Sequence, residues 1–187
     1  MLDIKSSYNK NYNNNYYEEF FKNLVHILNP KKIIEFGILN GYSLLQFAKY
    51  TSKNCKIKAY DLFDRYPFHA ANYKIINNKF SKYKKVQIIK GDYYKIFKKI
   101  KNNTVDIIHI DISNCGQVYE FAIVNYLKKI KKNGLMILEG GSKKRDNVTW
   151  MKKYKKIKIQ KILKKYSNNI YYKTIEYFPS VTIIKKK

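Results

Sequence analysis

Glu35, Gly37, Gly41 and Ser43 follow the spacing E-x-G-x-x-x-G-x-S. The two glycines can adopt positive φ angles or let a ligand approach the backbone closely. Apolar residues before Glu35 predict a buried strand, and those after Ser43 predict an amphipathic helix. Such a strand, turn and helix start bring free backbone N–H groups together, which suits a nucleotide cofactor. A tight turn that needs glycine for its conformation alone is the structural alternative.

Carboxylates also stand at the ends of the other predicted parallel strands, at Asp61, Asp92, Asp111 and Glu139. In open α/β sheets ligands bind outside the carboxyl ends of the strands, so these positions are candidates for binding or chemistry. Asp61 comes 20 positions after Gly41, where a nucleotide-binding βαβ unit places an acid that accepts hydrogen bonds from ribose hydroxyls. The ordinary alternatives are a turn aspartate and a strand-end acid paired with a lysine.

The elements that must position these residues follow from hydrophobic periodicity and breaker residues. Helices are predicted over residues 17–28, 41–50, 70–80, 93–100, 117–131, 148–154 and 157–166. Strands are predicted over residues 33–36, 56–60, 86–90, 105–111, 135–139, 169–177 and 181–184. We expect residues 1–29 to form a polar arm, able to act as a lid, and a helix, and residues 30–187 to form one domain.

These ordered motifs resemble those of the class I S-adenosylmethionine (SAM) methyltransferases, in particular the small O-methyltransferase-like branch. The matching stretches run from Glu35 to Ser43, through Tyr60-Asp61, Gly91-Asp92 and residues 105–111, to residues 134–139. The resemblance implies a three-layer αβα, Rossmann-like fold. Its seven-stranded sheet would be mostly parallel, with an antiparallel hairpin at the C-terminus.

The resemblance also implies SAM as the cofactor and assigns residues to it. Glu35 would face the amino group of the methionine moiety, directly or through water, Asp61 would hold the ribose, and Asp92 or its neighbours would approach the adenine. The full expected cofactor-binding set is Glu35, Gly37, Gly41, Ser43, Asp61, Asp92 and Asp111. An NAD(P)-linked enzyme is disfavoured because the dinucleotide fingerprint G-x-G-x-x-G is absent.

Methyl transfer from a sulfonium depends mainly on alignment and on a deprotonated nucleophile. Asp111 and Glu139 are therefore the candidate catalytic carboxylates, ahead of His109 and His69. The resembling branch includes enzymes that hold a divalent metal with an aspartate after the fourth strand and an Asp-Asn pair after the fifth. Asp111 matches the first position, but Glu139-Gly140-Gly141 replaces the pair. Two carboxylates could still bind Mg²⁺ or Ca²⁺ with waters, but the incomplete ligand set favours no metal.

The acceptor is expected to be a hydroxyl on a small molecule. The sequence Asp111-Ile112-Ser113-Asn114 lacks the Asn/Asp-Pro-Pro-Tyr/Phe motif that amino-methyltransferases acting on bases often carry. Arg145, which follows the fifth strand, is a candidate to receive an anionic group of the acceptor.

The formal net charge of +26 raises an RNA or DNA methyltransferase as an alternative, with lysines as a phosphate track. Only Arg65 and Arg145 are arginines, and the abundant Lys, Asn, Ile and Tyr have AT-rich codons. Genome composition therefore explains much of the charge, and nucleic acid is not the favoured partner. A SAM-binding protein without turnover is a further alternative.

No apolar run reaches the length of a membrane span, and no signal peptide is visible. Cys55 and Cys115 show neither metal-ligand spacing nor a disulfide framework. We therefore expect a cytoplasmic protein with two free thiols and no membrane partner.

Overall fold

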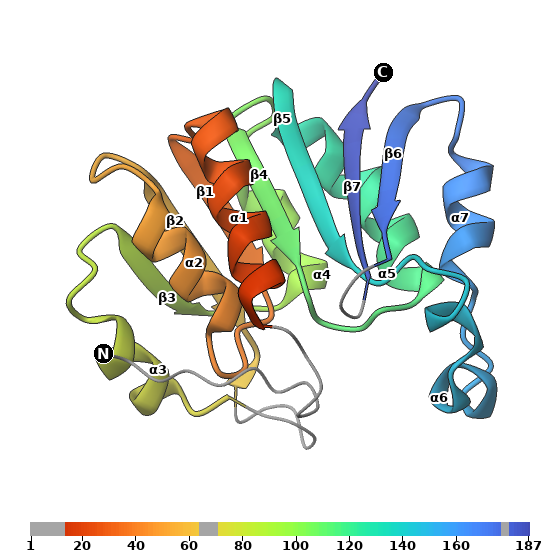
Figure 1. The fold of residues 1–187 in the computed structure, drawn as a ribbon, viewed down its shortest axis with the longest axis horizontal. Coiled ribbons are helices and arrows are strands. Elements are labelled where there is room, and N and C mark those ends of the chain that lie inside the picture. The colour runs from red at the N-terminus through yellow and green to blue at the C-terminus, as the bar shows by residue number, and fades with distance from the viewer. Residues whose placement is uncertain (1–13, 64–70, 177–179) are drawn as a thin grey trace. The chain divides into compact units, whose positions relative to one another are not determined.

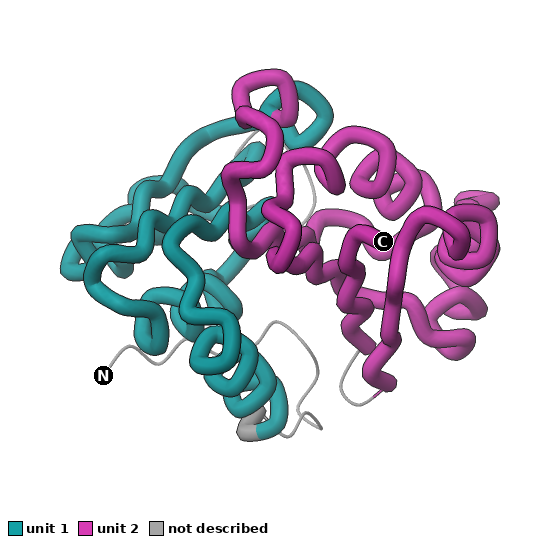
Figure 2. The backbone as a smooth tube through the Cα atoms, turned by 90° about the horizontal axis from the view of Figure 1, so that it is seen from above, with its two compact units in different colours: residues 1–96 teal, residues 97–187 magenta. Residues whose placement is uncertain are grey.

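The computed structural model describes residues 14–63, 71–176 and 180–187 (Figure 1). Its strands form a seven-stranded sheet in the order β3-β2-β1-β4-β5-β7-β6. The strand pairs β1–β2, β2–β3 and β4–β5 are parallel, whereas β5–β7 and β6–β7 are antiparallel. This confirms the expected mostly parallel sheet with a C-terminal hairpin. The chain divides into two compact units, residues 1–96 and 97–187 (Figure 2), and each is described on its own.

The first unit alternates helices and parallel strands. Its elements are α1 (Asn14–Leu28), β1 (Lys32–Phe36), α2 (Tyr42–Tyr50), β2 (Lys56–Asp61), α3 (Tyr73–Phe80), β3 (Val86–Lys90) and α4 (Tyr93–Ile96). Strand β2 lies between β1 and β3, with Ile57 in register with Ile33 on one side and Val86 on the other. The carboxyl ends of these three strands therefore meet at one edge, where the predicted cofactor residues are.

Aromatic packing holds α1 against α2. The ring of Phe21 is fully buried and meets that of Phe47 edge to face, with 4.9 Å between centroids. Burial of two such rings is a large hydrophobic contribution. Helix α1 ends where Asn29 adopts a positive φ of 42°, directly before Pro30, which cannot continue a helix. The arm predicted for residues 1–15 lies almost entirely outside the described residues.

The second unit carries the remaining four strands. Its elements are η2 (Phe97–Lys99), β4 (Val105–Ile110), α5 (Gly116–Phe121), η3 (Ala122–Tyr126), η4 (Leu127–Lys129), β5 (Ile130–Glu139), η5 (Arg145–Asn147), α6 (Thr149–Lys153), α7 (Ile159–Lys165), β6 (Ile170–Ile175) and β7 (Val181–Lys186). Helix α5 packs against α7. Of the helices within the described ranges, none combines the length and hydropathy that crossing a membrane requires.

The helix predicted over residues 117–131 ends two residues earlier than expected, and only its first part is an α-helix. The α-helix stops at Phe121, passes through a π turn and a 3₁₀ turn, and β5 already begins at Ile130. Ile130 pairs with Val105 whereas Leu135 pairs with Ile107, so β5 carries an irregularity between these pairs. Gly134 lies within that irregularity, where a Cβ would be 2.6 Å from the carbonyl oxygen of Asp106.

Candidate functional site

The glycine turn after β1 is tied to the neighbouring strand. The N–H of Gly37 donates to the carbonyl oxygen of Tyr60 at 2.9 Å, and Gly37 has a φ of 86°. Gly41 has a φ of 74°, and a Cβ there would lie 2.7 Å from a ring carbon of Phe80. Both the conformation and the packing inside the first unit therefore require glycine at Gly41. This explains that position without a ligand, and its contact with a cofactor stays a prediction.

Glu35 and Ser43 meet at the start of α2. Glu35 is fully buried, and its carboxylate accepts a hydrogen bond from the hydroxyl of Ser43. A buried carboxylate is costly unless it is hydrogen bonded, and bonds to a charged group are stronger than neutral ones. The structure thus brings these two expected residues together and makes Ser43 a positioning residue for the Glu35 carboxylate.

Asp61 joins the end of β2 to the same turn. Its Oδ2 accepts from the N–H of Ile38 at 2.7 Å and of Leu39 at 3.4 Å, and its Oδ1 accepts from the N–H of Phe63 at 2.8 Å. A carboxylate offers about four acceptor positions. The Oδ1 atom therefore keeps capacity for a further donor, such as a ribose hydroxyl.

Asp92 acts as a helix cap. Its Oδ1 accepts from the N–H of Tyr94 at 2.9 Å, and its carbonyl oxygen accepts from Lys95 and Ile96 at 2.9 Å each. These bonds satisfy the free N–H groups at the start of α4. Asp92 therefore has the structural role of a turn aspartate, which was the alternative to a binding role. Its approach to adenine stays a prediction.

In the second unit, Asp111 and Glu139 stand at adjacent strand ends. Ile110 pairs with Leu138 in the parallel β4–β5 ladder, and the two acids are the next residues along their strands. Neighbouring strands lie about 4.8 Å apart, so the backbones at these positions are close. Asp111 is partly exposed, whereas Glu139 is 1% exposed. Asp111 is therefore the more accessible of the two candidate catalytic carboxylates.

The buried Glu139 faces His109. Because His109 is in register with Ile137, its side chain shares a sheet face with Glu139. The Nε2 atom of His109 lies 3.6 Å from Oε1 of Glu139, and both side chains are buried. The sequence ranked His109 behind the carboxylates, and the structure adds that it is the partner of one of them. His69, the other histidine considered, lies outside the described residues.

Tyr119 is a buried donor to the end of β5. Its hydroxyl donates to the carbonyl oxygens of Leu138 at 3.2 Å and of Glu139 at 3.1 Å. Burial, and to a smaller extent the nearby carboxylates of Glu139 and Asp146, raise the pKa of the Tyr119 phenol well above its usual range. The hydroxyl therefore stays protonated and fixes this strand end. Sequence reasoning missed Tyr119, because only the tertiary fold brings it to β5.

The turn after β5 is anchored to β7. Gly140 donates its N–H to the carbonyl oxygen of Ser180 at 2.7 Å and accepts from the Thr182 hydroxyl at 2.9 Å. Gly141 has a φ of 104°, and a Cβ there would overlap the hydroxyl oxygen of Thr182. No local sequence pattern signals these contacts, since Ser180 and Thr182 lie some 40 residues downstream.

Two residues that follow this turn have defined contacts. Sequence reasoning singled out Arg145 but missed Asp146. Asp146 is buried and accepts from the N–H groups of Ile159 at 2.7 Å and Gln160 at 2.9 Å, which caps α7. The guanidinium of Arg145 stacks on the Trp150 ring, 5.1 Å from its centroid. A role of Arg145 towards an anionic acceptor stays a prediction.

A metal centre was considered at the strand ends of the second unit. Within residues 14–63, 71–176 and 180–187, no three or more His, Cys, Asp or Glu side chains are grouped in a way that could hold a metal ion. The two oxygens of Asp146, in the Asp146-Asn147 pair, accept from the N–H groups at the start of α7.

The chain is similar in sequence and in fold to known proteins. The chain is 28% identical over 123 residues to "Probable caffeoyl-CoA O-methyltransferase 2" of Dictyostelium discoideum, which is 64% of this chain and 52% of that protein. The chain thus spans about half the length of the curated relatives it matches.

Among solved structures, an O-methyltransferase from Bacillus cereus in complex with SAH superposes with a TM-score of 0.68 at 14% identity, covering 99% of this chain and 85% of that one. A putative O-methyltransferase from Klebsiella pneumoniae gives a TM-score of 0.72 at 13% identity, with coverages of 98% and 84%. These likenesses show the fold. The family model described as "O-methyltransferase" matches residues 5–169, and the chain accordingly belongs to the O-methyltransferase family.

Proposed function

We propose that this protein is a SAM-dependent methyltransferase that transfers a methyl group to an oxygen atom of a small-molecule acceptor. Membership of the O-methyltransferase family supports the reaction class. The observation that carries the proposal is the position of Asp61, whose carboxylate bonds the turn after β1 and keeps a free acceptor position. The names of the Dictyostelium discoideum relatives support an acceptor of low molecular mass.

The expected cofactor residues in the first unit suit the chemistry of SAM. Glu35, held by Ser43, provides negative charge for the ammonium group of the methionine moiety. Asp61 accepts hydrogen bonds from the ribose hydroxyls, and the backbone at Gly37 and Gly41 shapes the turn. Asp92 fixes the start of α4 beside the expected adenine position. When bound, SAM supplies a methyl group on a positively charged sulfur, which needs no further activation.

Asp111 is the better candidate for the proton acceptor. It is partly exposed at the end of β4, so an acceptor hydroxyl could reach it, whereas Glu139 is buried with His109. Removal of the hydroxyl proton raises the nucleophilicity of the acceptor oxygen. In this proposal Asp111 takes that proton and is also one of the cofactor-binding residues that the family resemblance implies, while Glu139 and His109 hold the adjoining strand end.

A cytoplasmic location is also part of the proposal. Cys55 and Cys115 are free thiols, and both are buried. Free thiols are the usual state of cysteine in a reducing compartment.

The first test is calorimetric titration of the folded protein with S-adenosylhomocysteine (SAH), with NAD⁺ as the control ligand. We expect micromolar binding of SAH and no heat with NAD⁺. Asp61→Ala should weaken SAH binding by about 10- to 150-fold, because a hydrogen bond to a charged group contributes about 1.5–3 kcal/mol. Glu19→Ala, which removes an exposed carboxylate from α1, should leave SAH affinity unchanged.

Asp61→Ala also leaves the N–H groups of Ile38 and Phe63 without their acceptor. Circular dichroism and a thermal melt should therefore accompany the titration, together with Asp61→Asn, which keeps one acceptor oxygen. A folded protein that gives no heat with SAH would contradict the cofactor assignment. A protein that binds SAH but methylates no hydroxyl compound in a broad screen with labelled SAM would contradict the enzymatic part.

A further inference from the structure

Residues 143–165, here called the basic segment, carry an unusual concentration of charge. Eleven of these 23 residues are Lys or Arg, compared with 39 of 187 in the whole chain. The single acid in the basic segment is Asp146, which is 3% exposed and bonded to α7. AT-rich codons can explain a high lysine content throughout the chain, but the share of basic residues in this stretch is more than twice that of the whole chain.

The lysines stand on an ordered scaffold. Asp146 ties η5 to the first turn of α7, and Gln160 donates to the carbonyl oxygen of Gly141. Helix α6 ends in a Schellman motif, in which Lys156 donates to Met151 at 2.9 Å and Lys155 donates to Lys152 at 3.1 Å. The basic side chains are therefore displayed by ordered backbone, on α6, on α7 and on the turns beside them (Figure 1).

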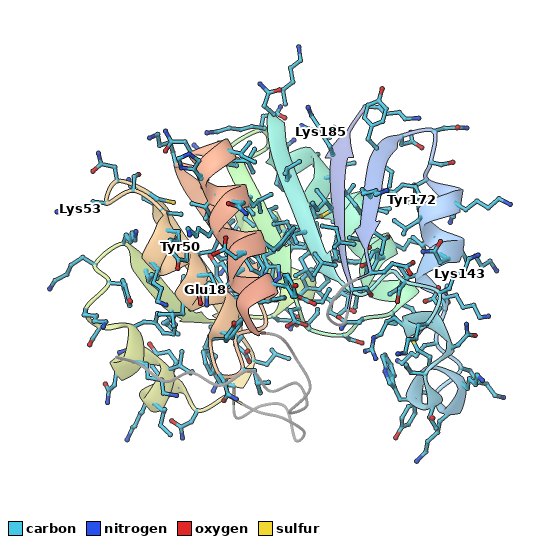
Figure 3. All side chains as sticks on the ribbon, in the orientation of Figure 1. Glu18, Tyr50, Lys53, Lys143, Tyr172 and Lys185 are labelled. Carbon is cyan, nitrogen blue, oxygen red and sulfur yellow. The ribbon has the colours of Figure 1, made fainter. Side chains whose placement is uncertain are left out.

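Few of these charges are neutralised by the protein. In the part of the chain that the structure describes, Lys165 is the one lysine of the basic segment that pairs with an acid, Glu120, at 2.6 Å. Lys143, which Figure 3 labels, is exposed, as are Lys152, Lys153 and Lys155. Side chains of this kind supply the phosphate affinity of nucleic-acid-binding proteins.

An exposed aromatic ring lies among the lysines. Tyr154 is 61% exposed, and the Nζ atom of Lys153 lies 5.5 Å from its ring centroid. Aromatic rings beside cationic side chains are the stacking platforms on which single-stranded nucleic acids place their bases. The apolar side chains of Met151, Ile159 and Ile162, by contrast, are each at most 3% exposed. No broad apolar face is left to enter a bilayer, which an amphipathic membrane helix would need.

We propose that the basic segment is a docking surface for single-stranded nucleic acid, with its lysines on the phosphates and Tyr154 stacked on a base. The inference goes beyond the proposed methyl transfer and does not depend on it, since the surface uses no residue of the expected cofactor set. It also does not make nucleic acid the methyl acceptor.

The test measures binding of a 5′-fluorescein-labelled 12-nucleotide oligo(U) RNA by fluorescence anisotropy at several salt concentrations. The triple variant Lys152→Gln, Lys153→Gln and Lys155→Gln should weaken binding at least tenfold at 0.1 M salt. It should also reduce the slope of log K against log salt by about 2, because each lost phosphate contact to a single strand changes it by about 0.7.

The matched control removes the same charge elsewhere in the second unit, at the exposed residues Lys98, Lys99 and Lys101, each changed to Gln. This control should change affinity by no more than about twofold, which is the small effect expected of distant charges in salt. Equal losses from the two triple variants would overturn the proposal, since binding would then reflect the net charge of the whole chain.

Tyr154→Ala tests the stacking part. It should weaken RNA binding by about tenfold with an unchanged salt slope, whereas Tyr154→Phe should bind as the parent does. Full affinity in Tyr154→Ala would overturn the assignment to nucleic acid. Binding of the triple variant to phosphatidylserine vesicles is measured as well, and loss of vesicle binding with RNA binding retained would also overturn it. SAH titration of the same variants reports on the cofactor site separately, so failure of one proposal is distinguishable from failure of the other.

Discussion

The turns after β1 and after β5 begin alike and are held in different ways. Each follows a buried glutamate, Glu35 or Glu139, and each contains glycines with positive φ. In the first turn, Asp61 at the end of β2 accepts from the turn's own N–H groups. In the second turn, the backbone is bonded to the hydroxyl of Thr182 and the carbonyl oxygen of Ser180 on β7.

This difference shows that an acid followed by glycine does not by itself specify a ligand site. The first turn is lined by a carboxylate that retains an acceptor position, which a ligand with hydroxyl groups can use. The second turn is fixed by neutral hydroxyl and backbone groups that bond one another, since Thr182 also bonds Thr174 at 3.0 Å. The first turn therefore suits the proposed contact with a cofactor, whereas the bonds of the second turn hold the end of β5.

The largest expected effect lies in the second turn. Gly141→Ala should lower the free energy of unfolding by about 3–5 kcal/mol, because it combines overpacking with a φ that L-residues rarely adopt. The added methyl group would overlap the Thr182 hydroxyl, which is held by Gly140 and Thr174 and cannot easily move. Urea unfolding measures this loss.

Gly140→Ala is the control for that experiment. Its φ of 97° is as unusual, but its Cβ would lie 3.0 Å from the flexible end of Ile159. We expect a loss of about 1–2 kcal/mol, mostly from the backbone conformation. Equal losses in the two variants would show that the Thr182 anchor does not distinguish this turn.

A smaller effect is expected in the first turn. Gly41→Ala should cost about 2 kcal/mol, from its positive φ and from contact with the Phe80 ring. Phe80→Leu makes room for the methyl group, so the double variant should be more stable than the sum of the two single changes predicts. Simple additivity would contradict the packing explanation for this glycine.

SAH affinity measured in Gly41→Ala, in Phe80→Leu and in the double variant tests whether a cofactor uses the backbone at Gly41. If Gly41 serves packing alone, the double variant should regain the affinity of Phe80→Leu. If the cofactor needs the bare backbone at Gly41, affinity stays low in both variants that carry the alanine. The two turns would then differ in function as well as in construction.

Much of this fold could be predicted from local sequence. The spacing of apolar residues predicted all seven strands. The breaker residue Pro30 predicted the end of α1, and Gly37 predicted the turn after β1. The early start of β5 could not be predicted in this way, because it depends on Gly134 lying against the carbonyl oxygen of Asp106. That contact is set by strand pairing and not by neighbours in sequence.

The residues of the candidate site also differ in whether local sequence could identify them. Glu35, Ser43 and Asp61 could be selected from spacing, since a βαβ unit fixes their relative positions. The pairing of His109 with Glu139 and the capping of α7 by Asp146 required the tertiary structure. The sequence therefore indicated the residues that meet at the first turn better than it indicated the contacts around β5.

The smallest expected effect is a pH dependence of stability, which we expect for the helix after the first turn but not for the second turn. Helix α2, which follows the first turn, is tied to α1 by the Tyr50 hydroxyl, which donates to the Glu18 carboxylate (Figure 3). This bond raises the pKa of Tyr50 to about 12 and lowers the pKa of Glu18 below its ordinary value. The second turn is held by threonine and backbone groups, which do not titrate in this range.

The sign of the pH dependence follows from linkage. The raised pKa of Tyr50 contributes stability that is complete below about pH 10, the ordinary value for tyrosine, and is lost as pH rises towards about 12. The lowered pKa of Glu18 contributes stability that is lost in acid.

Tyr50→Phe should therefore cost about 1 kcal/mol near pH 7, a figure reduced for the partial exposure of Glu18. That cost should shrink at both extremes, as measured by urea unfolding across pH against Tyr171→Phe, a change of an exposed tyrosine in the second unit. A cost that stays constant with pH would show that the hydrogen bond to Glu18 does not stabilise the helix of the first turn.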